Sequence, residues 1–198
     1  MTIKYLINQN LKGRTLIFDL DNTLYNENEF LKNRYKCISK NLSNNENESK
    51  DIYRFLLESF KKKGRKKLFD KLLKSMPHIK INKEDMIEIM RSKLPKASIQ
   101  LHDWFKNYLC ESLDEINIIT NGNPIQQKNK IECLFHNTRS HLNVIYANEL
   151  RPKPYPDSFI AFDKKYKAKK PIYIGDSLID KHFCKNAKIE FFDAKHLM

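Results

Sequence analysis

The stretch LIFDLDNTLY, Leu16 to Tyr25, decides the fold of this chain. Its apolar beginning predicts a buried strand, which ends abruptly at two carboxylates, Asp19 and Asp21, separated by one residue. Because side chains alternate along a strand, both carboxylates leave its end on the same side, and Leu20 turns back into the core. Paired carboxylates at the end of a buried strand suit a divalent metal, a nucleophile and a general acid or base.

Two simpler interpretations of this stretch need weighing. The pattern Asp-x-Asp-x also opens a calcium-binding EF-hand loop, but Leu20 and Leu24 are apolar here and no glycine follows at the sixth position. An ordinary turn after a strand is also rich in Asp and Asn. On this stretch alone, a turn without chemistry remains open.

Length and composition set the class of protein. A chain of 198 residues can build one large core, or a core with a small inserted domain, without disulfides. The four cysteines form no CxxC pair, which is typical of free thiols in a reducing compartment. The start of the chain has no apolar targeting segment, and no apolar run reaches membrane-spanning length. We therefore expect a soluble, cytoplasmic protein that does not contact a membrane.

The net charge of +13 and the pI of about 9.5 would by themselves indicate an anionic partner. The excess is almost entirely lysine in a chain also rich in Asn and Ile, so a compositional bias is the competing explanation. The basic run KKKGRKK, residues 61–67, is the best candidate for an electrostatic surface. No aromatic residue interrupts it, so we expect a solvated turn instead of a nucleic-acid or substrate-steering patch.

The rest of the chain divides into a helical region and an alternating one. Apolar residues at helical spacing predict four amphipathic helices between residues 26 and 98, the last beginning after an Asn82 N-cap. From Ile99 onward a helix comes first, and then β-branched runs alternate with helical patterns. This alternation predicts a parallel sheet covered on both faces. The later strands are expected at residues 116–120, 143–147, 171–176 and 189–192, and the helices between them near 124–135, 156–166 and 178–187.

Polar groups follow the first four predicted strands, at the sheet edge where ligands bind in open α/β folds. Taken singly, each group is also explained by an ordinary turn, a rigid proline loop or a common strand end. Lysine 153 stands between two prolines, which would stiffen its loop. After the first strand, the groups are Thr120, Asn121 and Gly122, then Lys153, then Asp176 and Asp180.

Together and in this order, these segments resemble the four motifs of the haloacid dehalogenase (HAD) superfamily of hydrolases. The matching segments are DLDNT at residues 19–23, IITNG at 118–122, KPYPDSF at 153–159 and GDSLID at 175–180. The resemblance implies a doubly wound, Rossmann-like α/β fold with a parallel five-stranded sheet. It also implies a magnesium-dependent phosphatase, and the helical insert between the first two motifs is similar to the family's C1-type cap.

The resemblance assigns a role to each motif. Asp19 would be the nucleophile that forms an aspartyl-phosphate, and Asp21 the general acid and then the general base. An aspartate at position 21 argues against the dehalogenase branch. Thr120 would bind the phosphoryl group with the backbone of Asn121 and Gly122. Lys153 would bind it too and neutralise its developing charge. The catalytic set is therefore Asp19, Asp21, Thr120 and Lys153.

A magnesium ion would be held by Asp19, the backbone carbonyl of Asp21, and Asp176. Asp180 completes the predicted metal set, and it is expected to orient Lys153 or a metal-bound water instead of binding the ion directly.

The predicted domains are an α/β core of residues 1–25 and 99–198 and an α-helical cap of residues 26–98. The predicted activity is hydrolysis of a small phosphomonoester, with sugar phosphates and nucleoside monophosphates as leading candidates; the DLDNTLY opening is also similar to some nucleotidases. Tyr25, Asn26, Arg34 and Tyr35 are hypothetical substrate contacts. A phosphotransferase or mutase on the same site, or an inactive basic module that binds nucleic acid, are the alternatives.

Overall fold

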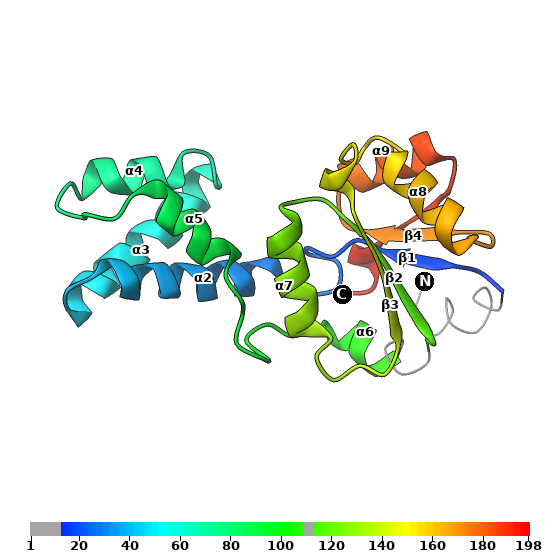
Figure 1. The fold of residues 1–198 in the computed structure, drawn as a ribbon, viewed down its shortest axis with the longest axis horizontal. Coiled ribbons are helices and arrows are strands. Elements are labelled where there is room, and N and C mark those ends of the chain that lie inside the picture. The colour runs from blue at the N-terminus through cyan, green and yellow to red at the C-terminus, as the bar shows by residue number, and fades with distance from the viewer. Residues whose placement is uncertain (1–12, 109–112) are drawn as a thin grey trace. The chain divides into compact units, whose positions relative to one another are not determined.

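The computed structural model describes residues 13–108 and 113–198. The chain forms two compact units (Figure 1). The first unit combines the residues up to Glu27 with Ile99–Met198, and the second consists of Asn28–Ser98. In the sequence, the second unit is thus inserted between the segment that contains the first strand and the rest of the first unit.

The first unit is built on a parallel sheet, which confirms the predicted α/β fold. The described part of the sheet has five strands in the order β3-β2-β1-β4-β5. All neighbouring strands pair in parallel, and β1 pairs with β2 on one side and β4 on the other. The strands are β1 (Leu16–Phe18), β2 (Glu115–Thr120), β3 (His141–Tyr146), β4 (Ile172–Gly175) and β5 (Glu190–Asp193).

Strand β1 is central because both of its faces are covered. Ile17 is fully buried in a cluster that includes Phe162 and Phe183. Phe18 points to the opposite face, where its ring lies 5.2 Å from the ring of Phe105 in an edge-on contact. A strand with two apolar faces reads as a continuous hydrophobic run, which is why the sequence identified it.

Helices cover both faces of this sheet (Figure 1). Helices α8 and α9 pack beside β3, β4 and β5, and α6 supplies the aromatic contact on the opposite face. Of the helix predicted here, Leu109 lies outside the described residues, as does the fourth cysteine, Cys110. The helices are α6 (Asp103–Tyr108), α7 (Pro124–Leu134), α8 (Asp157–Tyr166) and α9 (Leu178–Ala187), with the short 3-10 helices η1 (Ala147–Glu149) and η2 (Ala194–His196).

The second unit is a helical bundle, as the amphipathic spacing indicated. Its helices are α2 (Glu27–Leu42), α3 (Glu46–Lys63), α4 (Leu68–Ser75) and α5 (Lys83–Arg91). The predicted N-cap is present: the Asn82 side chain accepts a hydrogen bond from the Asp85 backbone N–H, and the Asp85 carboxylate accepts one from the Asn82 backbone N–H. The two bonds form a capping box. The proline at position 95 predicts that this helix runs to Leu94, the residue before it, but α5 ends at Arg91.

The basic run of residues 61–67 spans the end of α3 and the turn that follows it. Lys61, Lys62 and Lys63 form the last turn of α3, and Gly64 caps it with a positive φ of 62°. The lysines of the run are exposed. Lysines in a last helical turn also complement the helix dipole, so their position has a structural explanation.

Two further sequence expectations concern cysteines and membranes. Cys37, Cys133 and Cys184 are free thiols. Among the described helices, none has the length and apolar composition needed to cross a membrane. The first twelve residues, on which the expectation about a targeting segment largely rests, lie outside the described part of the chain.

Candidate active site

Strand β1 carries Asp19 to the carboxyl edge of the sheet, between the ends of β2 and β4. The Asp19 backbone N–H donates to the Ile174 carbonyl at 2.8 Å, which extends the strand ladder by one residue. Strand order reverses here, with β2 on one side of β1 and β4 on the other. Such switch points form the ligand crevices of open α/β sheets.

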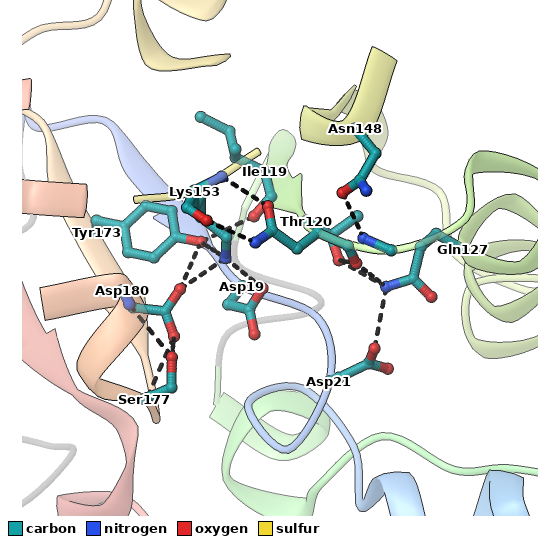
Figure 2. A network of polar contacts seen from close by, with 12 residues as sticks. Asp19, Asp21, Ile119, Thr120, Gln127, Asn148, Lys153, Tyr173, Ser177 and Asp180 are labelled. Atoms are coloured by element: carbon teal, nitrogen blue, oxygen red, sulfur yellow. Dashed lines mark hydrogen bonds and ion pairs between the residues drawn. The ribbon is translucent and has the colours of Figure 1, made fainter. Parts of the chain in front are cut away.

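A buried ammonium group lies against Asp19 (Figure 2). Nζ of Lys153 lies 2.7 Å from Oδ1 of Asp19 and 2.6 Å from Oδ1 of Asp180, and it donates to the Tyr173 hydroxyl at 2.6 Å. Burial opposes the charge on Lys153, but Asp19 and Asp180 outweigh it, so the pKa of Lys153 is raised. The site therefore holds a fixed positive charge.

The charge of Asp19 is finely balanced. The pKa of Asp19 is raised to about 7: burial raises it most, Lys153 lowers it, and Asp180 and Asp21 add to the rise. A carboxyl group with this pKa changes its charge near neutral pH. A cation bound beside it would favour the ionised, nucleophilic form.

Asp180 is fixed by the beginning of its own helix. Oγ of Ser177 accepts from the Asp180 backbone N–H at 3.2 Å and the Ser177 backbone N–H donates to Oδ2 of Asp180 at 3.2 Å, which together form a capping box for α9. The Ser177 hydroxyl also donates to Oδ2 of Asp180 at 2.5 Å. The preceding Gly175 leaves room for this carboxylate, because a Cβ there would lie 2.7 Å from Cγ of Asp180. Asp180 is thus positioned to orient Lys153.

Three carboxylates gather closely enough to hold one ion. Asp19, Asp176 and Asp180 each offer one oxygen, and these oxygens lie within 4.8 Å of one another. Burial, and then Asp180, raise the pKa of the half-buried Asp176. An all-oxygen donor set suits a hard divalent cation such as Mg²⁺. The residues present therefore fit a divalent metal, and the Asp21 carboxylate is not part of the cluster.

The residues predicted to bind phosphate lie at the end of β2. The Asn121 side chain and the Lys153 backbone exchange two hydrogen bonds, of 2.8 and 3.0 Å, so Asn121 ties this loop to the one carrying Lys153. The Gly122 N–H donates to Oδ1 of Asn148 at 2.8 Å. Gly122 has a φ of 120°, a conformation that favours glycine. Thr120 is buried, with its hydroxyl 2.8 Å from Nε2 of Gln127.

Asp21 lies in a separate group of hydrogen-bond donors. Nζ of Lys130 lies 2.7 Å from Oδ1 and 3.0 Å from Oδ2 of Asp21. The Tyr25 hydroxyl donates to Oδ1 at 2.5 Å. Nε2 of Gln127 donates to Oδ2 at 3.0 Å (Figure 2). Burial acts to raise the pKa of Asp21, but Lys130 and these donors outweigh it and the pKa is lowered.

Several of these partners were missed by the sequence reasoning. Tyr173 lies inside a predicted strand and Ser177 inside the fourth motif, where neither had been given a role. Gln127 and Lys130 lie three residues apart on the buried face of α7, beside Ile131. A lysine and a glutamine on an otherwise apolar helix face were the available signal, because such groups are buried only when they are paired.

Two hypothetical substrate contacts prove to be core residues of the helical unit. Arg34 is 2% exposed and donates to the Ile89 carbonyl and to the Ser92 hydroxyl. Tyr35 is 1% exposed and stacks edge-on against Phe60, with ring centres 6.1 Å apart. Their amphipathic spacing therefore reflects packing within this unit.

Residues 16–194 match the profile of the haloacid dehalogenase-like hydrolases, which covers most of the chain. The chain therefore belongs to this family, and it is an enzyme of the HAD hydrolase type. No match to the chain is found among curated proteins.

Solved structures share the fold at low sequence identity. The putative HAD-hydrolase YfnB of Bacillus subtilis is 19% identical, with a TM-score of 0.55, over 90% of this chain and 87% of that one. A family IA, variant 3 HAD hydrolase of Entamoeba histolytica is 19% identical, with a TM-score of 0.52, over 90% and 82% of the two chains. CbbY of Rhodobacter sphaeroides is 15% identical, with a TM-score of 0.52, over 89% and 83%.

Proposed function

We propose that this chain is a magnesium-dependent phosphatase that hydrolyses a small phosphomonoester through an aspartyl-phosphate on Asp19. The observation that carries the proposal is the pairing of the buried Asp19 carboxylate with Nζ of Lys153 at 2.7 Å, beside Asp176 and Asp180. A carboxylate held against a fixed positive charge can approach an anionic phosphate with less repulsion.

In the first half-reaction, an Asp19 oxygen attacks phosphorus and the bond from phosphorus to the ester oxygen breaks. Asp21 gives a proton to the departing alkoxide, so an alcohol leaves and Asp19 carries the phosphoryl group. Lys153 and the Thr120 hydroxyl offset the negative charge that develops on the phosphoryl oxygens.

In the second half-reaction, water attacks the aspartyl-phosphate. A water oxygen bonds to phosphorus, the bond to Asp19 breaks, and the proton of the water returns to Asp21. This step needs Asp21 as an anion, and its contacts with Lys130, Tyr25 and Gln127 favour that form. The same carboxyl group would serve both half-reactions, protonated in the first and ionised in the second, and the lowered pKa favours the form needed in the second.

A magnesium ion would be held by the carboxylates of Asp19 and Asp176 and by the Asp21 backbone carbonyl. Asp180, the third carboxylate of the cluster, would orient Lys153 or a metal-bound water. When bound, it supplies charge neutralisation that lets the Asp19 carboxylate and the substrate phosphate come together. Support comes from the carboxylate cluster, and the related YfnB structure is described as bound to magnesium.

The helical unit is the proposed cap, spanning about residues 26–98, of the C1 type. A cap of this kind shields a phosphorylated intermediate from bulk water and selects the substrate. Sugar phosphates and nucleoside monophosphates are the proposed substrates. The related CbbY structure contains xylulose-(1,5)bisphosphate, a sugar phosphate, which favours the first class.

Phosphate release from a panel of sugar phosphates and nucleoside monophosphates tests this function. The wild type should release phosphate with Mg²⁺ and lose this activity with a chelator. Asp19→Asn, which keeps the shape of the side chain but cannot form the acyl-phosphate, should lower the rate by at least about 10³-fold.

Activity that survives in Asp19→Asn or in the presence of chelator would contradict the mechanism. Transfer of the phosphoryl group to an added alcohol or sugar in place of water would instead identify a phosphotransferase.

A further inference from the structure

We propose that Lys130 is a positioning residue that holds the Asp21 carboxylate for the attack of water on the aspartyl-phosphate. This role rests on the function proposed above. It assigns a task to a residue outside the four motifs, on the helix that follows the second of them.

The contact between Lys130 and Asp21 is close and two-sided. Nζ of Lys130 reaches both carboxylate oxygens, at 2.7 and 3.0 Å, and the Lys130 side chain is only 1% exposed. Lys130 lies in the second turn of α7, so a rigid element fixes the base of its side chain. A carboxylate bound through both oxygens has little freedom to rotate.

A buried lysine at this position has no packing advantage. The same face of α7 carries Ile131 and Leu134, and an apolar side chain in place of Lys130 would pack there without the cost of burying an ammonium group. Nζ of Lys130 forms ion pairs with the carboxylates of Asp21, at 2.7 Å, and Glu27, at 3.7 Å. The charge is therefore explained by the carboxylates that it holds.

The Tyr25 hydroxyl is a close but uncharged donor to Asp21, at 2.5 Å, and Gln127 holds the carboxylate less firmly. Nε2 of Gln127 has two hydrogens but lies near three acceptors: the Asn121 carbonyl at 2.7 Å, the Thr120 hydroxyl at 2.8 Å and Oδ2 of Asp21 at 3.0 Å. Two hydrogens cannot serve three acceptors fully, and the contact with Asp21 is the longest. Lys130 is thus the ionic anchor, and Gln127 links Asp21 to the phosphate-binding Thr120.

An aryl phosphate separates the two half-reactions. Its aryloxide leaves without needing a proton, so formation of the aspartyl-phosphate does not depend on Asp21. Hydrolysis of the intermediate still needs Asp21 to accept a proton from water. A defect in the position of Asp21 should therefore slow only the second half-reaction.

The test is rapid-mixing kinetics of Lys130→Met with p-nitrophenyl phosphate and Mg²⁺. We expect a burst of p-nitrophenolate close to one equivalent per enzyme, followed by turnover about 10-fold or more below that of the wild type, a part of the general base effect of 10² or more. Lys128→Met is the matched control, because Lys128 lies on the same helix and is exposed. It should match the wild type.

A second set of variants tests whether Lys130 acts through Asp21. In an Asp21→Asn background, Lys130→Met should change turnover by less than about 2-fold, since coupled residues are non-additive. Lys130→Arg should restore part of the turnover, because it keeps the positive charge. Should Lys130→Met fail to fold by circular dichroism, Lys130→Gln, which stays polar, replaces it with the same expected burst.

Wild-type turnover in the folded Lys130 variant, a loss without a burst, or an equal loss in the Asp21→Asn background would overturn this role. Failure of the proposed function gives a different result: a wild type without any magnesium-dependent release, or one whose activity survives in Asp19→Asn.

Discussion

Asp19 and Asp21 are two residues apart, yet their environments shift their pKa values in opposite directions. Burial raises the pKa of Asp19 to about 7. For Asp21, burial is outweighed by Lys130 and by donors on Tyr25 and Gln127, and the pKa falls. These shifts keep Asp21 in the ionised form that accepts a proton from water, whereas Asp19 is partly protonated near neutral pH until a cation beside it favours its ionised form.

The lowered pKa of Asp21 predicts a pH-dependent contribution to stability. Because the folded form binds this proton more weakly than the unfolded chain, ionised Asp21 stabilises the fold above its unfolded pKa of about 3.9. That contribution is lost as the pH falls through the lower, folded value. Urea unfolding should show a larger free energy of unfolding for metal-free wild type than for Asp21→Asn. This difference should be constant above pH 5 and should decrease below about pH 4.

Asp51→Asn, at an exposed position of α3, controls for the loss of a surface carboxylate. A difference between wild type and Asp21→Asn that stays constant from pH 6 to pH 3 would show that the fold does not lower this pKa.

At the scale of single residues, the sequence predicted the acidic site residues but not the side chains that contact them. The carboxylates proposed to be catalytic directly follow an apolar strand, so a local pattern identifies them. Lys130 and Gln127 reach Asp21 across more than 100 positions in the sequence, and only the folded packing of α7 reveals the contact. The same holds for the Tyr173 hydroxyl beside Lys153.

At the scale of elements, the junction of β4 and α9 depends on a close approach. Gly175 ends β4, and Asp180 lies in the first turn of α9 with a side chain that is 2% exposed. The Asp180 carboxylate cannot retreat without weakening its contacts with Lys153 and Ser177. Glycine is therefore required by space at position 175.

Gly175→Ala should consequently destabilise the protein and reduce its activity. The added methyl group would lie 2.7 Å from Cγ of Asp180, and overpacking of this kind costs about 1–3 kcal/mol. Thermal unfolding with phosphate release measures both effects. Wild-type stability and turnover in Gly175→Ala would mean that Asp180 has more room than the structure shows.

Most elements were predictable because their apolar spacing is local. The strands are short buried runs and the helices have one apolar face, so both patterns can be read from neighbouring residues. The order β3-β2-β1-β4-β5 was not predicted, because it depends on which distant strands pair. Helix ends were the least predictable: α5 ends at Arg91 and is capped by Ser92, whose hydroxyl accepts a hydrogen bond from the Arg34 side chain, before Pro95 is reached.

At the scale of the whole molecule, the net charge of +13 is the feature that hydrolysis of a small substrate explains least. The lysines of residues 61–67 are exposed and belong to a helix end and a turn, which agrees with a solvated surface. The substrate could not be predicted, because substrate choice depends on side chains that a cap brings together in three dimensions. Arg34 and Tyr35 illustrate the difficulty, since both serve the core of the helical unit.

The most direct test of the account is to trap the covalent intermediate. The protein is mixed with Mg²⁺ and an accepted phosphomonoester, quenched in acid within milliseconds, and reduced with borohydride, which converts an aspartyl-phosphate to homoserine. Peptide mass spectrometry should then find homoserine at position 19, and none after omission of substrate or in Asp19→Asn. Phosphate release without any modification at position 19, or modification at another carboxylate, would contradict the proposed nucleophile.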